Sequence, residues 1–444
     1  MQNVSFPAAS SDQPNGITSL RNLPAEGQDN LADRRILIFE LSVGGHYPEY
    51  ISHLVSFWCE QRLPGCLYIV VVPEFLSRHA DVVAIASKQQ TNPNQVHFIP
   101  LTSEERANLK PYGSGIDRNL RAWQEFNLID QYARQLKIDR IFLPYLDTRM
   151  LPLALGKSLP CPFSGIYFRP SFHYPSFCPH RLSWKEKIQQ IREKITLSRV
   201  LRQPQLTTLY SLDPFAVEQI NQLSKLPKAK PLPDPVKIYP QPPLDAAAVK
   251  SKLGIEPSRQ IHLLFGDLNK RKGLEQILAA IAILPAELAS KLCLLLVGSM
   301  SESNYLKFQE QKARLSKLLP IQIIDHNQYV PEPDIQNYFE LADSILALYQ
   351  RHVGMSGILN RAAVAQKPVL STDYGLMGEI TRRYQLGLTV DSSNPQEIAQ
   401  GLSKFLQESP AKYCNYQQMA TFADQNSVAK FTTTIFQDLQ VSSR

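Results

Sequence analysis

The sequence predicts an α/β protein with two doubly wound parallel sheets, each in its own domain. The chain has 444 residues, of which 43% are hydrophobic and 20% charged, enough for two globular domains that each bury a core. Short apolar runs, typical of strands buried on both faces of a sheet, alternate with helical patterns in both halves. A proline-rich stretch over residues 226–245 separates the halves and predicts a linker.

The composition of the chain sets the expected domain limits. Residues 1–33 are rich in Ser, Asn, Gln, Pro and Asp without periodicity, which predicts a disordered tail. The first domain is expected over residues 34–225 and the second over residues 246–410. The last segment, residues 411–444, is expected to be helical.

In the first domain, the glycines after the first strand are the first candidate for a binding loop. The expected strands are 36–41, 67–72, 96–100, 140–143, 165–168 and 207–212. Gly44, Gly45 and His46 follow the first strand, and a helix is expected from Pro48 to Glu60. A strand, glycines and then a helix turn backbone N–H groups toward an anion. His46 either contacts that ligand or only hydrogen-bonds its own turn.

Polar residues also follow other strands of this domain. Ligands of doubly wound sheets bind beyond the carboxyl ends of the strands, which points to Asp147, Arg169 and Asp213. Asp213 precedes a proline, so we interpret it as a helix N-cap with proline at the first helical position.

A basic amphipathic helix is expected over residues 184–202. Its apolar positions recur at helical spacing, and Lys and Arg residues fill its other faces. The apolar positions are Trp184, Ile188, Ile191 and Ile195, and the basic ones are Lys185, Lys187, Arg192, Lys194 and Arg199. Two interpretations stay open: peripheral contact with an anionic membrane, or a helix packed on the domain with a solvated outer face.

The second domain contains two glycine-bearing turns that each precede a helix. Its expected strands are 261–265, 292–297, 321–324, 344–348 and 368–371, and helices are expected over 273–283, 334–341, 395–407 and 428–439. Gly354, Ser356 and Gly357 lie where one helix begins, and the turn over 373–379 repeats the arrangement. Unpaired N–H groups at a helix start suit a phosphate, although a serine there is also an ordinary N-cap.

These residues resemble the nucleotide-sugar half of the GT-B glycosyltransferases, in the retaining group that includes sucrose synthase-like and bacterial exopolysaccharide and lipid glycosyltransferases. Members usually carry E-G-F-G-x-x-x-x-E-A-M-A-x-G-x-P-V and then G-G-x-x-E. Here V-G-M-S-G-I-L-N-R-A-A-V-A-Q-K-P-V is followed by Y-G-L-M-G-E. Val353 and Arg361 stand where the two glutamates of the E-x7-E motif belong. The resemblance implies two Rossmann-like domains facing across a cleft.

The resemblance also assigns roles. In G-D-L-N-K-R-K-G, Lys272 aligns with a lysine that neutralises the donor diphosphate. Asp267 replaces an arginine, and Arg271 is the candidate to compensate for it, since a guanidinium can bind two phosphate oxygens. The family's histidine-containing turn corresponds to Arg169 or His173. The implied catalytic residues are therefore His46, Arg169 and Lys272. The implied contacts to the donor phosphates and sugar are Gly44, Gly45, Arg271, Gly354, Ser356, Gly357, Arg361 and Glu379. Candidates for holding the base are Asp325, His326 and Asn327.

The function implied by the resemblance is transfer of a hexosyl group from a nucleotide-sugar to a glycan or lipid-linked acceptor, as in polysaccharide biosynthesis. The alternative is a catalytically silent GT-B protein that acts as a binding or scaffold partner in glycan assembly. The sequence contains no D-x-D, in agreement with metal-independent chemistry, and the nucleotide-sugar is a co-substrate, so no cofactor or metal is expected. In GT-B proteins the C-terminal helices pack back on the first domain, which the resemblance implies for residues 411–444, where Phe431, Ile435 and Leu439 form an apolar stripe.

Composition excludes several other classes. The six cysteines lack C-x-x-C spacing, which favours reduced thiols without a zinc site. No apolar run approaches the ~18 residues of a membrane span and no signal pattern begins the chain, so we expect a cytoplasmic protein, on the inner membrane face if the acceptor is a lipid. The net charge of +7 is mild, and no basic stripe is interleaved with aromatics, so nucleic acid is not an expected partner.

Overall fold

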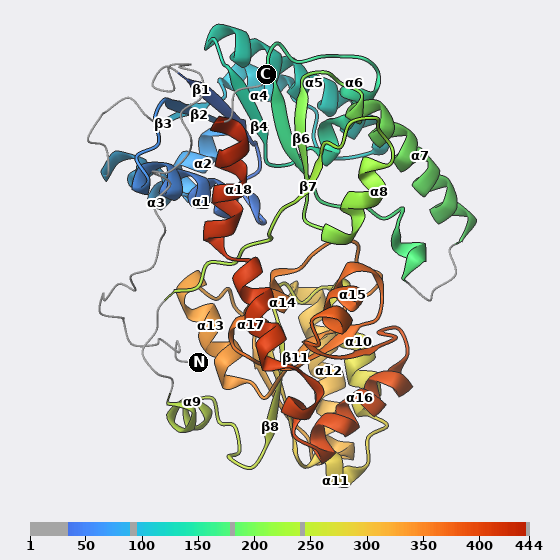
Figure 1. The fold of residues 1–444 in the computed structure, drawn as a ribbon. Helices are drawn as coiled ribbons and strands as arrows, with labels where there is room; N and C mark the ends of the chain where they lie inside the picture. The colour runs from blue at the N-terminus through green and yellow to red at the C-terminus, as the bar shows by residue number, and fades with distance from the viewer. Residues whose placement is uncertain (1–33, 89–95, 178–182, 240–244, 441–444) are drawn as a thin grey trace. The chain divides into compact units, whose positions relative to one another are not determined.

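The computed structural model describes residues 34–88, 96–177, 183–239 and 245–440 (Figure 1). The disordered tail expected over residues 1–33 lies outside this range. The described chain forms two compact α/β units. The N-terminal unit contains residues 34–88, 96–173, 183–233 and 428–440. The C-terminal unit contains residues 174–177, 234–239 and 245–427.

The N-terminal unit is built on a seven-stranded parallel sheet in the order β3-β2-β1-β4-β5-β6-β7. Its strands are β1 (Arg35–Phe39), β2 (Cys66–Val71), β3 (Val96–Pro100), β4 (Arg140–Leu143), β5 (Phe163–Tyr167), β6 (Leu206–Ser211) and β7 (Ala229–Pro231). The first six strands were predicted. The seventh lies inside the stretch interpreted as a linker, so that interpretation is wrong for residues 229–231. Pro231 is tolerated because β7 is the edge strand.

Helices surround this sheet and include the end of the chain. They are α1 (Tyr47–Glu60), α2 (Pro73–Arg78), α3 (Ala80–Lys88), α4 (Ser103–Asn108), α5 (Gly115–Gln135), α6 (Met150–Ala154), α7 (Trp184–Leu201), α8 (Val217–Asn221) and α18 (Val428–Gln440). Helix α18 lies beside α1 (Figure 1), and the ring of Phe431 contacts that of Tyr50 at 4.9 Å. The carboxylate of Asp438 accepts hydrogen bonds from Thr208 and Tyr210 of β6. Helix α18 thus packs on the N-terminal unit, as expected for its apolar stripe.

The C-terminal unit has a six-stranded parallel sheet in the order β10-β9-β8-β11-β12-β13. Its strands are β8 (Gln260–Phe265), β9 (Leu292–Val297), β10 (Gln322–His326), β11 (Ser344–Ala347), β12 (Val369–Thr372) and β13 (Gly387–Val390). Its helices are α9 (Ala246–Lys252), α10 (Leu274–Ile281), α11 (Ala286–Ala289), α12 (Glu302–Leu318), α13 (Glu332–Leu341), α14 (Gly357–Val364), α15 (Gly375–Arg383), α16 (Pro395–Gln407) and α17 (Tyr416–Gln425).

Two boundaries differ from those predicted. Helix α17 packs on α14 and belongs to the C-terminal unit, so the expectation that all of residues 411–444 pack on the first domain is wrong before residue 428. Residues 174–177, in turn, belong to the C-terminal unit although they precede the linker. Within the described residues, none of the helices combines the length and the apolar character that a membrane crossing requires.

The strand order of each sheet defines one preferred binding position. The order changes direction beside β1 in the first sheet, where β1 pairs with β2 and β4. It changes beside β8 in the second, where β8 pairs with β9 and β11. Connections on either side of such a switch point leave in opposite directions and open a crevice at the carboxyl ends of the strands.

Gly273, which separates the turn after β8 from α10, provides a test of this packing. Its φ is +73°, and a Cβ atom would lie 2.4 Å from the carbonyl oxygen of Leu348. Gly254 has a similar φ of +68°, but a Cβ there would meet nothing within 4 Å. We expect Gly254→Ala to lower the free energy of unfolding by about 1–2 kcal/mol, the strain of a left-handed residue, and Gly273→Ala to lower it substantially more. Urea unfolding of both variants measures this difference, and equal losses would contradict the proposed steric conflict.

Candidate functional site

The switch point of the C-terminal unit contains a buried lysine. Strand β8 ends at Phe265, and a single 3-10 turn, Lys270–Lys272, follows. Lys272 is only 4% exposed, and its Nζ donates to the carbonyl oxygen of Phe265 at 2.7 Å and to Tyr349 Oη at 2.5 Å. Both partners are neutral, and no ion pair of Lys272 with a described carboxylate is formed. A buried ammonium without a counter-charge is costly, so this position favours an anionic ligand.

Tyr349 connects this lysine to the next helix of the site. It lies just beyond β11, its hydroxyl is 2.8 Å from Ser356 Oγ, and its ring centroid is 4.4 Å from Lys272 Nζ. The guanidinium carbon of the exposed Arg271 lies 5.3 Å from the same centroid. Sequence reasoning did not select Tyr349, although an aromatic residue directly after a buried strand at a switch point was available as a signal.

Residues 354–357 form the other side of the switch point, at the start of α14. Ser356 is the N-cap residue, but its side chain makes no capping hydrogen bond, and the residue is 8% exposed. The interpretation of Ser356 as an ordinary side-chain N-cap is therefore wrong. The backbone N–H of Gly354 donates to Tyr174 Oη at 3.0 Å. The structure thus brings together Lys272, Ser356 and the positive end of α14, a combination suited to phosphate oxygens.

Arg361 occupies the place of the missing motif glutamate and is neutralised locally. It lies one turn into α14, and its Nη2 is 2.6 Å from Oε2 of Glu332, the first residue of α13. The Arg361 side chain is 7% exposed, whereas that of Glu332 is 31% exposed. Arg361 can only donate hydrogen bonds, but Glu332 brings a carboxylate to the same position. Glu332 was not selected from the sequence because it lies outside the motif.

The remaining donor-side candidates have structural partners. Glu379 lies on α15, where Arg382 and Arg383 bind its carboxylate; although burial opposes it, these arginines hold its pKa below the usual range. Asp325 is bound by Tyr305, Gln309 and Lys312 of α12. His326 Nδ1 lies 2.8 Å from Tyr338 Oη, and the side chain of Asn327 accepts the backbone N–H of Met300.

In the N-terminal unit, the glycine loop after β1 lies at the switch point beside β4. Gly44 and His46 are exposed, Gly45 has a φ of +72°, and a Cβ at Gly44 would meet nothing within 4 Å. His46 starts α1 without a side-chain capping bond, and its ring is 6.4 Å from that of Tyr50. The loop therefore has open space beside Gly44, whereas a Cβ at Gly45 would lie 3.8 Å from the ring of Tyr47.

A network of buried charged residues stabilises this loop. Arg149 donates to Glu125 at 2.9 Å and lies 3.7 Å from Glu40, and all three residues are at most 3% exposed. The carboxylate of Glu40 also accepts the backbone N–H of Ser42 at 2.9 Å. Burial raises the pKa of Glu40, although Arg149 opposes this. The network fixes both the loop after β1 and the turn after β4.

Asp147 is the strongest candidate for proton chemistry in this unit. It follows β4, and its Oδ2 accepts the backbone N–H of Phe168 at 2.9 Å. Burial raises its pKa to about 7, against the opposing effects of this N–H and of the Arg169 charge. The neighbouring rings of Tyr47 and Tyr145 have centroids 5.0 Å apart. The structure thus places Asp147 and the exposed Arg169 near one another, beside an aromatic surface.

His173, the alternative to Arg169, is a structural residue. It is 2% exposed, and its Nε2 is 2.9 Å from Oδ2 of Asp213. Oδ1 of Asp213 accepts the backbone N–H of Phe215, with Pro214 at the first helical position. The N-cap interpretation of Asp213 is confirmed. The imidazole of His173 is thus buried and paired with Asp213, whereas Arg169, the other alternative, is exposed.

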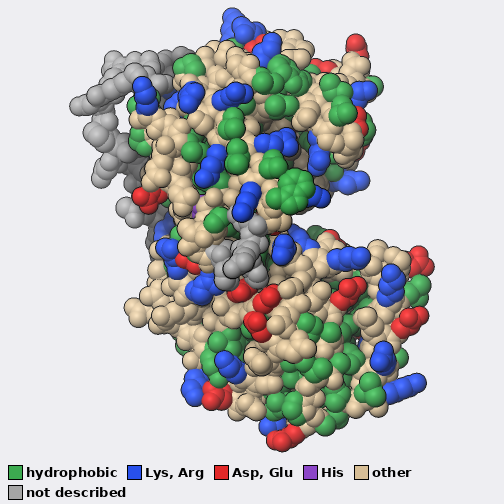
Figure 2. Space-filling model, turned by 90° about the vertical axis from the view of Figure 1, so that its right-hand side faces the viewer, with side chains coloured by type: hydrophobic (Ala, Val, Ile, Leu, Met, Phe, Trp, Pro, Cys, Tyr) green, Lys and Arg blue, Asp and Glu red, His purple; other side chains and the backbone are tan. Residues whose placement is uncertain are grey.

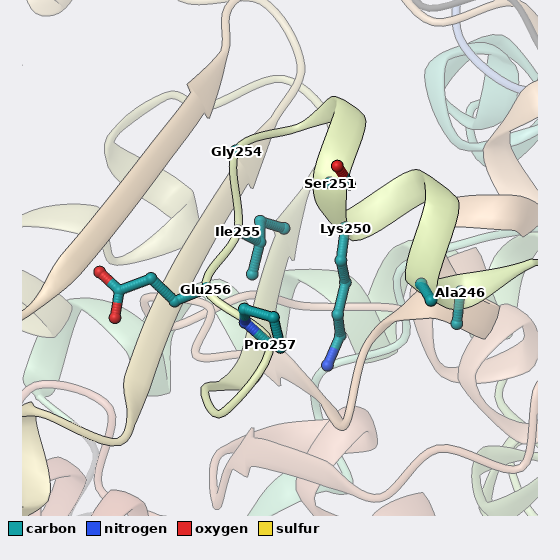
Figure 3. Close-up of a pocket in the computed structure, with 8 residues that line it drawn as sticks. Ala246, Lys250, Ser251, Gly254, Ile255, Glu256 and Pro257 are labelled. Atoms are coloured by element: carbon teal, nitrogen blue, oxygen red, sulfur yellow. The ribbon is translucent and has the colours of Figure 1, made fainter.

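The surface pocket in Figure 3 does not belong to this site. It has a volume of about 520 Å³ and lies between α9 and the turn before β8, where Lys250, Gly254 and Pro257 line it (Figure 3). It therefore borders the amino end of β8, whereas Lys272 follows the carboxyl end. Among the described residues, no group of three or more His, Cys, Asp or Glu side chains is arranged to hold a metal ion.

Two α/β units, each with polar residues at the switch point of a parallel sheet, define the architecture of a GT-B protein. Comparison with solved structures shows the same fold. Anabaena Alr3699/HepE in complex with UDP superposes with a TM-score of 0.64 at 14% identity, covering 91% of this chain and 99% of that chain. The fold is therefore GT-B, as predicted.

Sequence comparisons add a family match. Residues 245–421 match the family model described as Glycosyl transferases group 1. A D-inositol 3-phosphate glycosyltransferase of Thermobispora bispora is 23% identical over 51% of this chain and 51% of its own, so the chain spans about half the length of that relative. The putative glycosyltransferase YtcC of Bacillus subtilis is 23% identical over 79% of this chain and 82% of its own. Together with the fold, these matches support a GT-B glycosyltransferase.

The raised pKa of Asp147 predicts a pH-dependent stability. The usual pKa of this carboxyl is 3.8, and its pKa in the fold is about 7. The stability that the protonated form contributes is therefore fully present below about pH 4 and is lost as the pH rises through 7. The side chain of the Asp147→Asn variant cannot ionise. Its free energy of unfolding relative to that of the wild type should therefore rise by roughly 1–3 kcal/mol between pH 5 and 8, after a discount for partial exposure. Thermal unfolding at several pH values measures the difference. A difference between the two proteins that stays constant with pH would contradict the prediction.

Proposed function

We propose that the protein transfers a hexosyl group from a nucleoside-diphosphate sugar to a glycan or lipid-linked acceptor. The observation that carries this proposal is the buried Lys272, whose partners are neutral, beside the start of α14. A UDP-sugar is the proposed donor, because the Anabaena fold relative is described in complexes with UDP and with UDP-glucose. The proposed setting is polysaccharide biosynthesis in the cytoplasm.

The proposed chemistry is stabilisation of a leaving diphosphate. The bond between the anomeric carbon and the diphosphate oxygen breaks, and its electron pair leaves with the nucleotide. The acceptor hydroxyl oxygen forms the new bond to that carbon and loses its proton. Lys272 and the first N–H groups of α14 would stabilise the departing negative charge, so this step needs no metal ion. Retention of the anomeric configuration is proposed only from the resemblance to the retaining group.

The N-terminal unit is the proposed acceptor side. Asp147, with its raised pKa, is placed to accept a proton near neutral pH, and the rings of Tyr47 and Tyr145 offer an apolar surface of the kind that sugar rings pack against. The proposed roles of His46 and Arg169 are contacts to substrate from the loops after β1 and β5. These assignments follow from the position of each residue beyond the carboxyl end of a strand.

Replacement of Lys272 tests the donor site. We expect Lys272→Ala, and the similarly long Lys272→Met, to weaken binding of uridine diphosphate and its sugars roughly tenfold or more, since a charge-assisted contact contributes about 1.5–3 kcal/mol. Lys270→Ala, on the same turn but exposed, is the matched control and should change the affinity little. Calorimetric titration with uridine, guanosine and adenosine diphosphates and their sugars measures the affinities and identifies the base.

The outcomes separate the two functions considered. Donor binding with turnover of a sugar nucleotide supports the transferase. Donor binding without transfer to any glycan or lipid acceptor supports a silent binding or scaffold protein, an alternative favoured by the loss of both motif glutamates at Val353 and Arg361. If the folded protein binds none of the nucleotides, the proposed donor site is wrong.

Glu332 is the proposed acceptor for the ribose hydroxyls. The second motif glutamate is replaced by Arg361, but Arg361, in the last turn of α14, holds the carboxylate of Glu332 at 2.6 Å. The carboxylate is still 31% exposed and so can accept further hydrogen bonds. In this proposal, the charge of the missing glutamate is supplied from α13, while Arg361 orients it.

An analogue without ribose hydroxyls tests this role. Glu332→Gln should weaken binding of uridine diphosphate roughly tenfold, because a carboxylate acceptor becomes a weaker amide one. It should change the binding of 2′,3′-dideoxyuridine diphosphate little. Glu340→Gln, on the exposed end of the same helix, is the control. Equal weakening for both ligands would show that Glu332 acts only through Arg361 or through stability.

A further inference from the structure

Helix α7 has an apolar stripe on its outward face. The four side chains of the stripe are 67%, 49%, 58% and 50% exposed, in chain order. They are Trp184, Ile188, Ile191 and Ile195. At about 100° per residue, they fall within about 60° of the helix circumference. The helix packs on its unit through the opposite side, where Leu197, Val200 and Leu201 are buried. The stripe is therefore not the packing face of the helix, and its four side chains are left on the outer face.

The charges that surround this stripe are positive. Lys187 and Lys194 lie along one side of it, and Lys185, Arg192 and Arg199 along the other, by the same helical geometry. All five are exposed. Figure 2 turns this side of the molecule toward the viewer and shows green and blue side chains intermixed over the N-terminal unit.

The two acidic residues of α7 do not offset these cations on the outer surface. The carboxylate of Glu186 forms a capping box with Ser183 at the start of the helix. The carboxylate of Glu193 accepts hydrogen bonds from the hydroxyl of Tyr167 at 2.5 Å and from Ser171 at 2.7 Å, on the inner side of the helix. The outward face thus combines apolar side chains at its centre with cations on both borders.

We propose that α7 docks the N-terminal unit on an anionic lipid bilayer. The isoleucines would enter the boundary between headgroups and acyl chains, with the tryptophan at the interface, while the lysine and arginine stems extend to the lipid phosphates. Charge complementarity selects this partner over a second copy of the chain. Two copies joined through the stripe would bring ten like charges of the two borders together, which opposes association.

Docking and sugar transfer are separate properties of the molecule. Binding of α7 to lipid requires neither Lys272 nor a nucleotide, so it stands or fails independently of the proposed transferase. Where both hold, docking would place the N-terminal unit next to lipid-linked acceptors, because the acceptor side belongs to the same unit.

Co-sedimentation with vesicles tests the proposal. The full chain should bind vesicles of phosphatidylcholine with 30% phosphatidylglycerol, and it should bind vesicles of phosphatidylcholine alone much more weakly. The reason is that roughly one kcal/mol of attraction to anionic lipid is expected per basic residue. Ile188→Gln combined with Ile191→Gln should weaken binding at least tenfold, since two buried apolar side chains are lost. The control is Leu306→Gln with Leu318→Gln on α12, residues that are 61% and 66% exposed and should not affect binding.

Fluorescence locates the contact. Vesicles should shift the emission of Trp184 to shorter wavelength, and Trp184→Phe should remove that shift while Trp58 and Trp123 remain. Absence of binding by the folded wild type to anionic vesicles would overturn the proposal. So would binding that the isoleucine variant retains in full, which would show purely electrostatic adsorption. A dimer in solution that the isoleucine variant abolishes, without vesicle binding, would assign the stripe to a second copy.

Discussion

The structure of the C-terminal unit depends on how it accommodates the buried charge of Lys272. The Lys272 ammonium group is 4% exposed, donates to two neutral oxygens and lies over the ring of Tyr349, but it has no negative partner, and burial of such a charge is costly. The fold holds it rigidly all the same, through the carbonyl of Phe265 and the hydroxyl of Tyr349. Such an arrangement stores electrostatic free energy that an arriving anion can release, which is how preorganised sites favour a charge that develops during a reaction.

The arginine that stands in place of the second motif glutamate pairs in space with a carboxylate from outside the motif, that of Glu332. An unpaired arginine at position 361 would leave a buried cation in the last turn of α14, which the helix dipole there compensates only in part. The ion pair with Glu332 restores a negative group at this place and leaves it partly exposed. The charge balance at position 361 thus depends on residues that are neighbours in space. The sequence motif includes Arg361 but not its partner Glu332.

The sequence predicted the parts of the fold that local patterns determine. The buried strands of both sheets are short apolar runs in the sequence. The ends of these runs predicted that Lys272 and residues 354–357 lie in the turns after strands, where the structure has them. The strands that were missed, β7 and β13, lie at sheet edges, contain Pro231 and Gly387, and are only partly buried, so they lack a continuous apolar pattern. Tyr349, Glu332 and the Arg149 network were missed because their partners are 7 to 109 residues away and become neighbours only in the folded chain. The sequence likewise could not predict whether the apolar stripe of α7 faces the domain or the outside. A helical wheel shows that a face is apolar but not what covers it.

Both units have polar residues at the switch point of a parallel sheet, but the buried titratable groups there differ in charge. At the switch point of the C-terminal unit lie Lys272 and the start of α14, both positive. At that of the N-terminal unit, Asp147 and Glu40 have raised pKa values because burial disfavours their charged forms, and a phosphate beside them would raise those values further. In the proposed function, the nucleoside diphosphate binds the C-terminal unit, and an uncharged hydroxyl that must lose a proton binds the N-terminal unit. The buried Lys272 in one unit and the buried carboxyl groups in the other support this proposed assignment of donor and acceptor sides.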